Sequence, residues 1–256
     1  MSASATERAD IARYATRSAS VRGSMERVLE PEVMDTAEEA ADYDAMDHGA
    51  VNERFCADLL AARELSGKVL DVGTGTALIP IALCKRTPHV QVVAIDLAVH
   101  MLALAKRNVD ASGLADRIEL IKVDAKGLPF DDGEFPAVVS NSIVHHIPEP
   151  RSVLAEMLRV TAPGGLVFVR DLFRPPTDAE VDRLVHLYGG EPPLDEGQRG
   201  SFDHQRMLFR DSLKAALTLD EVRALAKDAG MPGARVSMTS DRHWTLLHEK
   251  ASHDGG

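Results

Sequence analysis

Aromatic side chains are scarce in this sequence, which has 256 residues with 4% Phe, Trp and Tyr against 45% hydrophobic residues overall. Aliphatic side chains must therefore fill most of the core, and a chain of this length has enough of them for one large α/β domain. No apolar run is long enough to span a bilayer, and the N-terminus lacks the apolar stretch of a secretory signal. We therefore expect a cytoplasmic protein without a membrane span.

Positive charge is also in short supply, since 29 basic residues stand against 40 acidic ones and the formal net charge is -11. A protein that grips a nucleic-acid backbone needs clustered Lys and Arg, and no dense run of them is present. The two cysteines, Cys56 and Cys84, lie in apolar helical patterns, which is typical of buried thiols in a reducing compartment. No pair has the spacing of a metal knuckle. The sequence thus predicts neither nucleic-acid binding nor a metal site.

The most informative part of the chain is the stretch KVLDVGTGTA, residues 68–77. Its apolar start predicts a short buried strand, and Gly73 and Gly75 allow a tight turn that a ligand can approach closely. A helix predicted over 77–85 would then point its free N–H groups and its dipole into the crevice, as in nucleotide sites. Pro80 is compatible with that helix only near its first turn.

The residues around these glycines distinguish one nucleotide from another. A dinucleotide fingerprint has a third glycine or alanine where this chain has Leu78, and Asp71 at the strand end would repel a pyrophosphate. An acid at this place suits a ligand that carries an ammonium or sulfonium group. The run VLDVGTGT, residues 69–76, resembles the first motif of class I S-adenosylmethionine (SAM)-dependent methyltransferases.

Two further predicted strands end in an acid. Strand 90–95 is followed by Asp96, which is placed to accept hydrogen bonds from ribose hydroxyls. Strand 118–123 is followed by Asp124. The resemblance implies that this acid reads the adenine amino group, for which a carboxylate is a suitable acceptor.

The next predicted strand, 135–140, ends in Asn141 and Ser142. It lies where the strand order should reverse, so these two residues are expected to face the methionine part of SAM. His145 and His146 follow and should face the entrance of the methyl acceptor. If the acceptor is a hydroxyl, a carbon acid or an amine, one of them is placed to act as a base. The alternative is that they only cap or pack.

The resemblance covers roughly residues 69–170, including LPFDDGEF (128–135) and LRVTAPGGLVFV (158–169). It implies SAM as cofactor, S-adenosylhomocysteine as product, and a small-molecule acceptor of the quinone-biosynthesis type, methylated by in-line displacement. The expected SAM-binding residues are Tyr43, Asp71, Gly73, Thr74, Gly75, Asp96, Leu97, Met101, Asp124, Ala125, Asn141 and Ser142. The candidate acceptor-site residues are His48, His146, Arg170 and Asp171.

Tyr43 and Arg170 are included for separate reasons. Tyr43 stands in a predicted helix just before the core, which resembles the lid that covers the methionine end of SAM in small-molecule methyltransferases. Arg170 alternates with apolar residues in a buried strand, so its charge needs a partner or a substrate anion.

The predicted fold is an α/β, Rossmann-like, doubly wound sheet of seven strands. The sheet is mostly parallel, with a C-terminal antiparallel hairpin (234–239 and 243–248) and helices on both faces. A tail (1–23) precedes a single domain (24–256). The parts of this domain are a helical lid with a first helix over 24–29 (24–65), the SAM-binding core (66–175), a substrate cover (176–217), and the final helix and hairpin (218–249).

Two other functions stay open from the sequence. One is an NAD(P)-dependent oxidoreductase, which Leu78, Asp71 and the lack of a Tyr-x-x-x-Lys pair disfavour. The other is a non-catalytic SAM-binding module that regulates a partner. The assembly of the chain is open as well, a homodimer included. The methyltransferase hypothesis requires Asp71, Asp96, Asp124 and Asn141 to share a single crevice.

Overall fold

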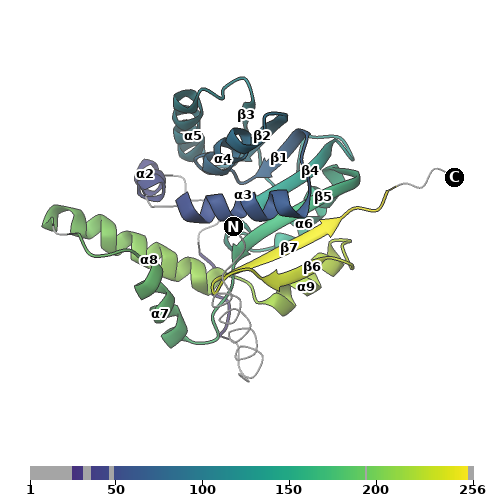
Figure 1. Ribbon diagram of the computed structural model, residues 1–256. Coiled ribbons are helices and arrows are strands. Elements are labelled where there is room, and N and C mark those ends of the chain that lie inside the picture. Colours follow the sequence, from purple (N-terminus) through teal and green to yellow (C-terminus); the bar gives the residue numbers. More distant parts are fainter. Residues whose placement is uncertain (1–24, 31–35, 46–48, 194, 253–256) are drawn as a thin grey trace.

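The computed structural model describes residues 25–30, 36–45, 49–193 and 195–252, and a mixed seven-stranded sheet forms its centre (Figure 1). The strand order is β3-β2-β1-β4-β5-β7-β6. The strands are β1 (Gly67–Val72), β2 (Val90–Asp96), β3 (Ile118–Lys122), β4 (Phe135–Asn141), β5 (Thr161–Leu172), β6 (Arg235–Met238) and β7 (His243–Glu249). Strands β1 to β5 are parallel and β7 is antiparallel to both β5 and β6, which confirms the predicted sheet.

Eight α-helices are present within the described residues. They are α2 (Ala37–Ala45), α3 (Gly49–Ala62), α4 (Leu78–Arg86), α5 (Val99–Ser112), α6 (Pro150–Val160), α7 (Asp178–Tyr188), α8 (Arg199–Ala215) and α9 (Leu219–Asp228). None of these is long and apolar enough to cross a membrane. Pro80 is the third residue of α4, in the first turn as predicted.

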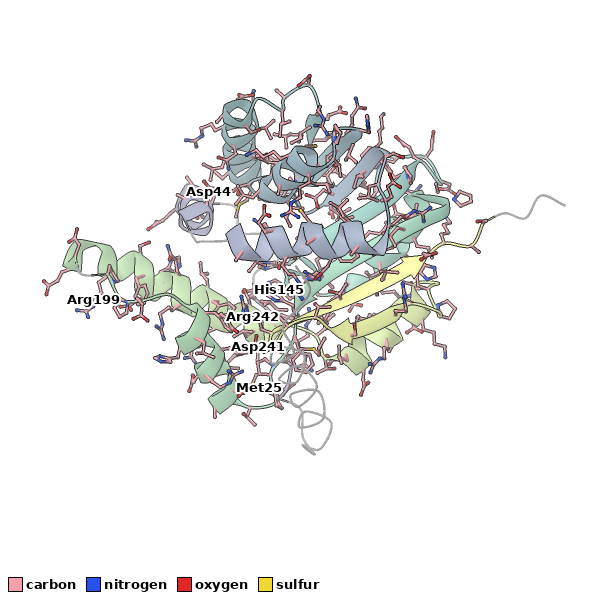
Figure 2. The ribbon with its side chains drawn as sticks, viewed as in Figure 1. Met25, Asp44, His145, Arg199, Asp241 and Arg242 are labelled. Atoms are coloured by element: carbon pink, nitrogen blue, oxygen red, sulfur yellow. The ribbon has the colours of Figure 1, made fainter. Side chains whose placement is uncertain are left out.

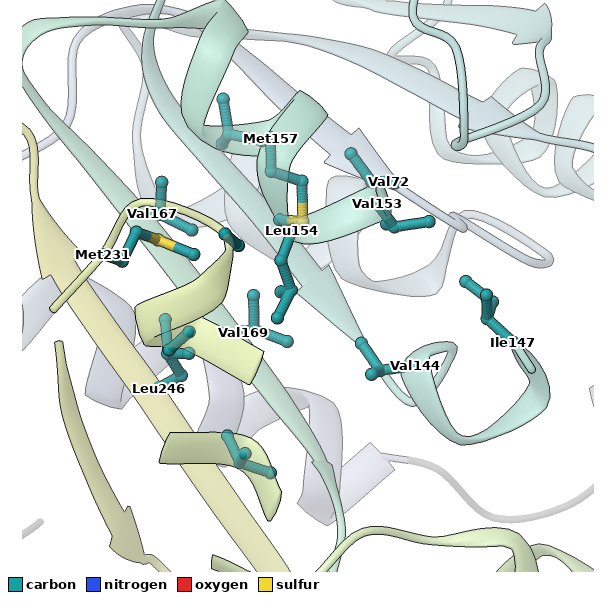
Figure 3. Packing of buried hydrophobic residues seen from close by; sticks show 14 of the residues in the cluster. Val72, Val144, Ile147, Val153, Leu154, Met157, Val167, Val169, Met231 and Leu246 are labelled. Atoms are coloured by element: carbon teal, nitrogen blue, oxygen red, sulfur yellow. The ribbon is translucent and has the colours of Figure 1, made fainter. Parts of the chain in front are cut away.

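Successive side chains of a strand point to opposite faces of the sheet, and in these strands the side chains on both faces are apolar. Helices therefore cover both faces. In β1, Val69 packs on the side of α3, α4 and α5, whereas Leu70 packs on the side of α6 and α9. Figure 3 shows the second side, where Leu154 and Met157 of α6 lie against the sheet. Both faces are mostly aliphatic, as the low aromatic content predicted, although the largest fully buried side chains are Trp244, Phe55, Phe135 and Phe168.

Residues 25–30, here called the strap, are not helical, so the helix predicted over 24–29 is wrong for this part of the chain. Tertiary hydrogen bonds replace helical ones. Arg27 donates to the carbonyl oxygens of Ala215 at 2.7 Å and His145 at 3.0 Å, and Val28 N donates to Lys214 O at 3.2 Å. The Arg27 side chain thus connects the strap to two segments that are distant in the sequence.

Helices α7 and α8 form an arm beside the sheet, and Figure 1 shows α8 extending beyond it. Their contact is a small separate apolar cluster around Leu184 and Leu213, on which Met25 of the strap also packs (Figure 2). Helix α8 begins at Arg199 and, like α7, lies within the segment 176–217 that the sequence predicts as a substrate cover. The role of this arm as a substrate cover stays a prediction.

Candidate functional site

The turn after β1 needs its first glycine. Gly73 has φ 74°, and a Cβ atom at this position would overlap the side chain of Ile143. The amides of Gly73 and Thr74 both donate to Ile95 O, at 2.9 and 2.8 Å, which fixes the turn against the end of β2. The close approach of Ile143 therefore leaves no room for a side chain at residue 73.

A cleft lies above the carboxyl ends of β1, β2, β3 and β4, with an open volume of about 840 Å³. It is called the main cleft below. Its lining includes ten of the predicted site residues, namely Gly73, Gly75, Asp96, Leu97, Met101, Asp124, Ala125, Asn141, Ser142 and His146. The reversal of strand order between β1 and β4 places the cleft where ligands bind in open α/β sheets.

Asp96 is held in the main cleft by backbone amides. Its Oδ2 accepts from Gly75 N at 2.8 Å and its Oδ1 accepts from Ala98 N at 2.9 Å. Burial raises the pKa of Asp96 above its usual value, although these amides oppose the shift. Each oxygen keeps a second lone pair, so the carboxylate is fixed in place and still able to accept hydrogen bonds from a ligand.

Asp124 and Ala125 form the opposite wall of the cleft. Asp124 Oδ1 accepts from Lys126 N at 2.9 Å, and Lys126 Nζ lies 3.4 Å from Oδ2. The Asp124 side chain is half-exposed and retains free acceptor positions. The wall therefore combines a small apolar residue with an acceptor, as an adenine edge requires.

Asp71 lies in a second, adjoining hollow of about 340 Å³, and Thr74 lines it too. Gly73 and Asn141 line both spaces, so the four strand-end residues surround two adjoining hollows, and the expectation of a single crevice is wrong for Asp71. The reason is the strand's alternation, which puts Asp71 on the face of Val69, towards α3 and α4. Burial raises the pKa of Asp71 to about 7, so a cation beside it would be strongly favoured.

Three buried polar atoms around these hollows have no hydrogen-bond partner within the described chain. They are Thr74 Oγ1, Thr76 Oγ1 and Asn141 Oδ1. Buried polar atoms are rarely left unpaired, and such atoms mark places where a ligand or water completes the bonding. Together with the glycine turn and the acids, they match a nucleoside joined to a cationic amino acid, which is the chemistry of SAM.

His145 is almost fully buried, and its Nδ1 lies 2.5 Å from Asp171 Oδ1. Asp171 Oδ2 accepts from the amides of Val144 at 2.6 Å and His145 at 3.2 Å. Burial alone would lower the pKa of His145, but the charge of Asp171 outweighs it and raises that pKa. Asp171 therefore holds the ring of His145 in place. It does not line the main cleft.

His146 lies at the edge of the main cleft, next to the strap. Its Nδ1 is 3.0 Å from Glu30 Oε1, and His145 Nε2 is 3.5 Å from the same oxygen. Burial lowers the pKa of His146, and the neighbouring His145 lowers it further. The roles of the two histidines in catalysis stay predictions.

Arg170 lines neither hollow. Its Nη2 donates to Asp58 at 2.7 Å and its Nε to Thr245 Oγ1 at 3.0 Å. The guanidinium also lies 5.7 and 5.8 Å from the ring centroids of Phe55 and Phe168. The partner that its buried charge requires is therefore inside the protein, which favours a structural role.

Two predicted residues fall where their side chains are not described. Tyr43 is part of α2, whose Ala40 packs against Ala98 and Met101 at the rim of the main cleft. Asn108 Nδ2 also donates to Asp44 Oδ1 at 3.1 Å, which ties α2 to α5. The helix thus lies where a lid is expected. His48 lies outside the described residues.

Several lining residues were not predicted. They are Asn52, Thr76, Lys126, Ile143 and Ile147, and behind the lining Glu30, which contacts His146. All of these except Asn52 and Glu30 lie within a few residues of a predicted strand end and could have been found there. Glu30 and Asn52 come from the N-terminal part of the chain, and no local pattern connects them with the glycine turn.

This chain matches a methyltransferase family model and relatives that are named as methyltransferases. Residues 69–165 match the family model of a methyltransferase domain. The chain is 37% identical over 178 residues to a demethylmenaquinone methyltransferase of Thermus thermophilus, covering 67% of this chain and 77% of that protein. It is 28% identical over 180 residues to the ubiquinone/menaquinone biosynthesis C-methyltransferase UbiE of Roseobacter denitrificans, covering 70% and 71%.

A solved structure shows the same fold. It is a SAM-dependent methyltransferase from Aquifex aeolicus, with a TM-score of 0.59 and 21% identity over 83% of this chain and 97% of that one. The comparisons favour neither the oxidoreductase nor the non-catalytic module.

Proposed function

This chain belongs to the class I SAM-dependent methyltransferases, and from that premise we propose which residues hold the cofactor and which acceptor it methylates. Its relatives act on small molecules, and the enzyme uses SAM. The main cleft and the hollow beside Asp71 are the proposed SAM site. The acceptor is proposed to be an oxygenated ring of the quinol type.

The proposed cofactor contacts follow from the chemistry of each strand end. Asp96 accepts from the ribose hydroxyls with the lone pairs that its amide partners leave free. Asp71 and Asn141 take the ammonium end, where a buried acid with a raised pKa gains most from a cation. Asp124 and Ala125 take the adenine edge. Gly73 leaves the room that the ligand needs.

The quinol acceptor is supported by the named relatives that this chain matches over two thirds or more of their length. SAM would supply an activated methyl group. The ring carbon would attack the methyl carbon, so that a C–C bond forms while the S–CH3 bond breaks, S-adenosylhomocysteine leaves, and the ring carbon releases its proton. The protein's part is mainly alignment of the two reacting carbons. An acceptor oxygen next to that carbon must also lose or share its proton to make the carbon nucleophilic.

The observation that carries the proposal is the position of His146. It lines the same cleft as Asp96 and Asp124, at the side of the strap. The acceptor is proposed to enter beside this histidine, with its oxygen towards His146 and its ring carbon towards the methionine end. His145 and Asp171 stay behind it as the support.

The test is calorimetry of the purified full-length chain with SAM and S-adenosylhomocysteine. Asp96→Ala should weaken binding by about ten- to one-hundred-fold, the size expected for lost charge-assisted hydrogen bonds. The matched control is Asp116→Ala, an exposed acid away from the cleft, which should bind as the wild type does. Binding of NAD with no binding of SAM would overturn the proposal.

The acceptor is tested separately with methyl-labelled SAM and demethylmenaquinol. Transfer of label to the ring is expected. If SAM binds but label reaches neither this quinol nor any compound of a metabolite extract, the acceptor assignment is wrong and a regulatory role is favoured.

A further inference from the structure

We propose that Glu30, His145 and His146 form a binding site for one divalent transition-metal cation at the acceptor end of the main cleft. Neither the family match nor the named relatives point to a metal. The proposal starts from three side chains, each of which offers one ligand atom, with these atoms all within 4.8 Å of one another.

The distances match those between ligands of a shared ion. Glu30 Oε1 lies 3.0 Å from His146 Nδ1 and 3.5 Å from His145 Nε2. Zinc bonds to nitrogen and oxygen are about 2.0–2.2 Å long, so two ligands in tetrahedral geometry lie roughly 3.3 Å apart. The carboxylate oxygen is thus close to where it would stand if all three atoms coordinated one ion.

The second observation is how little besides one ion pair holds these atoms. Glu30 Oε1 and His146 Nδ1 lie 3.0 Å apart as a buried ion pair, and among the described residues neither atom has a hydrogen bond of good geometry. The Glu30 side chain is only 9% exposed, so water does not readily supply a better partner. A cation between the carboxylate and the ring nitrogens would satisfy these buried atoms more fully than the pair alone.

The surroundings of His145 are those of a metal ligand. Its Nδ1 is 2.5 Å from Asp171 Oδ1, which leaves Nε2 on the side of Glu30. A carboxylate on the far nitrogen of a ligating histidine fixes the ring and makes the near nitrogen a better ligand. Asp171 is itself held by the amides of Val144 and His145. The arrangement explains why an acid is buried at this point of β5.

Glu30 is delivered by an anchored segment. Three residues before it, Arg27 donates to the carbonyl oxygens of His145 at 3.0 Å and Ile147 at 3.1 Å. Ser212 Oγ donates to the other oxygen of Glu30 at 3.3 Å. The strap is therefore fixed to the same turn that carries both histidines, and the three ligands come from two segments that Arg27 joins.

The ligand set and the charge define the class of ion. Two imidazoles and one carboxylate suit Zn²⁺ and other first-row divalent cations, and three protein ligands leave a position open. Glu30 and Asp171 bring two negative charges to a buried place beside the two imidazoles, where the Arg27 guanidinium offsets one of them, and a divalent cation would offset the charge that remains.

The open position gives the ion a part in the reaction, and this step rests on the proposed function. His146 lines the main cleft, so a cation at this site would lie beside an acceptor oxygen. A bound divalent cation polarises such an oxygen and stabilises its deprotonated form. The phenolic proton leaves to solvent, and the neighbouring ring carbon becomes nucleophilic without a protein base.

The test uses the full-length protein, freed of metal with a chelator and titrated with Zn²⁺ in a calorimeter. One site per chain is expected. Glu30→Gln and His146→Ala should each weaken Zn²⁺ binding at least tenfold. The control is His186→Ala, an exposed histidine on α7, which should keep the wild-type affinity. As a second readout, Co²⁺ should give visible absorption bands in the wild type that Glu30→Gln lacks.

The proposal is overturned if the wild type shows no Zn²⁺ site with a stoichiometry of one per chain. It is also overturned if Glu30→Gln and His146→Ala bind Zn²⁺ as tightly as the wild type and the control do. Titration of the metal-free protein with S-adenosylhomocysteine distinguishes this failure from that of the cofactor site. Cofactor binding should persist without Zn²⁺ and in Glu30→Gln. Loss of that binding would count against the proposed function and leave the metal measurement intact.

Discussion

The two ends of the main cleft are built in different ways. At the end proposed to bind the cofactor (the cofactor end), each polar side chain lies at or near the end of its own strand, and backbone amides hold the central acid, as Asp96 shows. At the end proposed to receive the acceptor (the acceptor end), Glu30, His145 and Asp171 come from three distant parts of the chain and hold one another through side chains. The first end is set by the order of strands, whereas the second depends on how remote segments pack.

This difference predicts where substitutions act. Changes at the cofactor end should alter SAM affinity with little effect elsewhere. Changes in the buried supports around the sheet should alter the free energy of unfolding and leave SAM affinity unchanged. The predictions below test that separation.

The largest effect is expected at Gly73. Gly73→Ala puts a Cβ into the Ile143 side chain and also strains a backbone with φ 74°. SAM affinity should fall by at least about one-hundred-fold, because the turn that approaches the ligand must move. Calorimetry measures the affinity and urea unfolding measures the stability.

Gly113→Ala is the matched control for this change. Gly113 has nearly the same backbone, with φ 71°, but a Cβ there meets nothing within 4 Å. It should cost about 1–2 kcal/mol of unfolding free energy from the backbone alone and leave SAM affinity unchanged. Equal losses of SAM affinity in both variants would show that the close approach to Ile143 does not matter.

The next effect is a pH dependence that Asp71 imposes. Burial raises the pKa of Asp71 to about 7 in the free protein, and an ammonium beside it would lower that pKa. Binding below pH 7 therefore releases a proton, so SAM affinity should rise about tenfold per pH unit up to pH 7 and then level off. Asp71→Asn should lose this slope. Parallel slopes in both proteins, measured by calorimetry between pH 5.5 and 7.5, would exclude Asp71 as the cause.

A smaller effect is expected at Arg170, in the support of the sheet. Arg170→Met keeps most of the packing between Phe55 and Phe168 but loses the bonds to Asp58 and Thr245. Arg54 still pairs with Asp58, so the loss of unfolding free energy should be about 1–2 kcal/mol. SAM affinity should stay within about twofold of the wild type, because Arg170 lines neither hollow. A tenfold loss of affinity without destabilisation would give Arg170 a direct role at the site.

The smallest effect is expected at Thr218, which begins α9. Its side chain and Glu221 form a capping box, far from the cleft. Thr218→Ala should lower the free energy of unfolding by about 1 kcal/mol with no change in SAM binding. The same urea and calorimetric measurements apply, and any change in SAM affinity would break the separation between support and site.

The sequence predicted most of the strand-end residues that line the main cleft, because their signals are local. Asp96, Asp124 and Asn141 each follow an apolar run, and parallel strands bring their carboxyl ends to one edge. Asp71 lies in the adjoining hollow instead, because the alternation of β1 turns its side chain to the face of Val69, which α3 and α4 cover.

The acceptor end was predicted only in part, because it depends on long-range contacts. The two histidines follow a strand end and were found, but Glu30 precedes them by more than one hundred residues in an irregular segment. The strap was predicted to be helical, but it is irregular, because Arg27 forms hydrogen bonds to carbonyl groups far away in the sequence. No periodicity in the sequence reports such contacts.

The most direct measurement is a structure of this protein bound to S-adenosylhomocysteine. The account predicts ribose hydroxyls within hydrogen-bond distance of Asp96, the adenine beside Ala125 and Asp124, and the ammonium end beside Asp71 and Asn141. A ligand outside the main cleft, or one whose ribose is held by residues other than Asp96, would contradict the account.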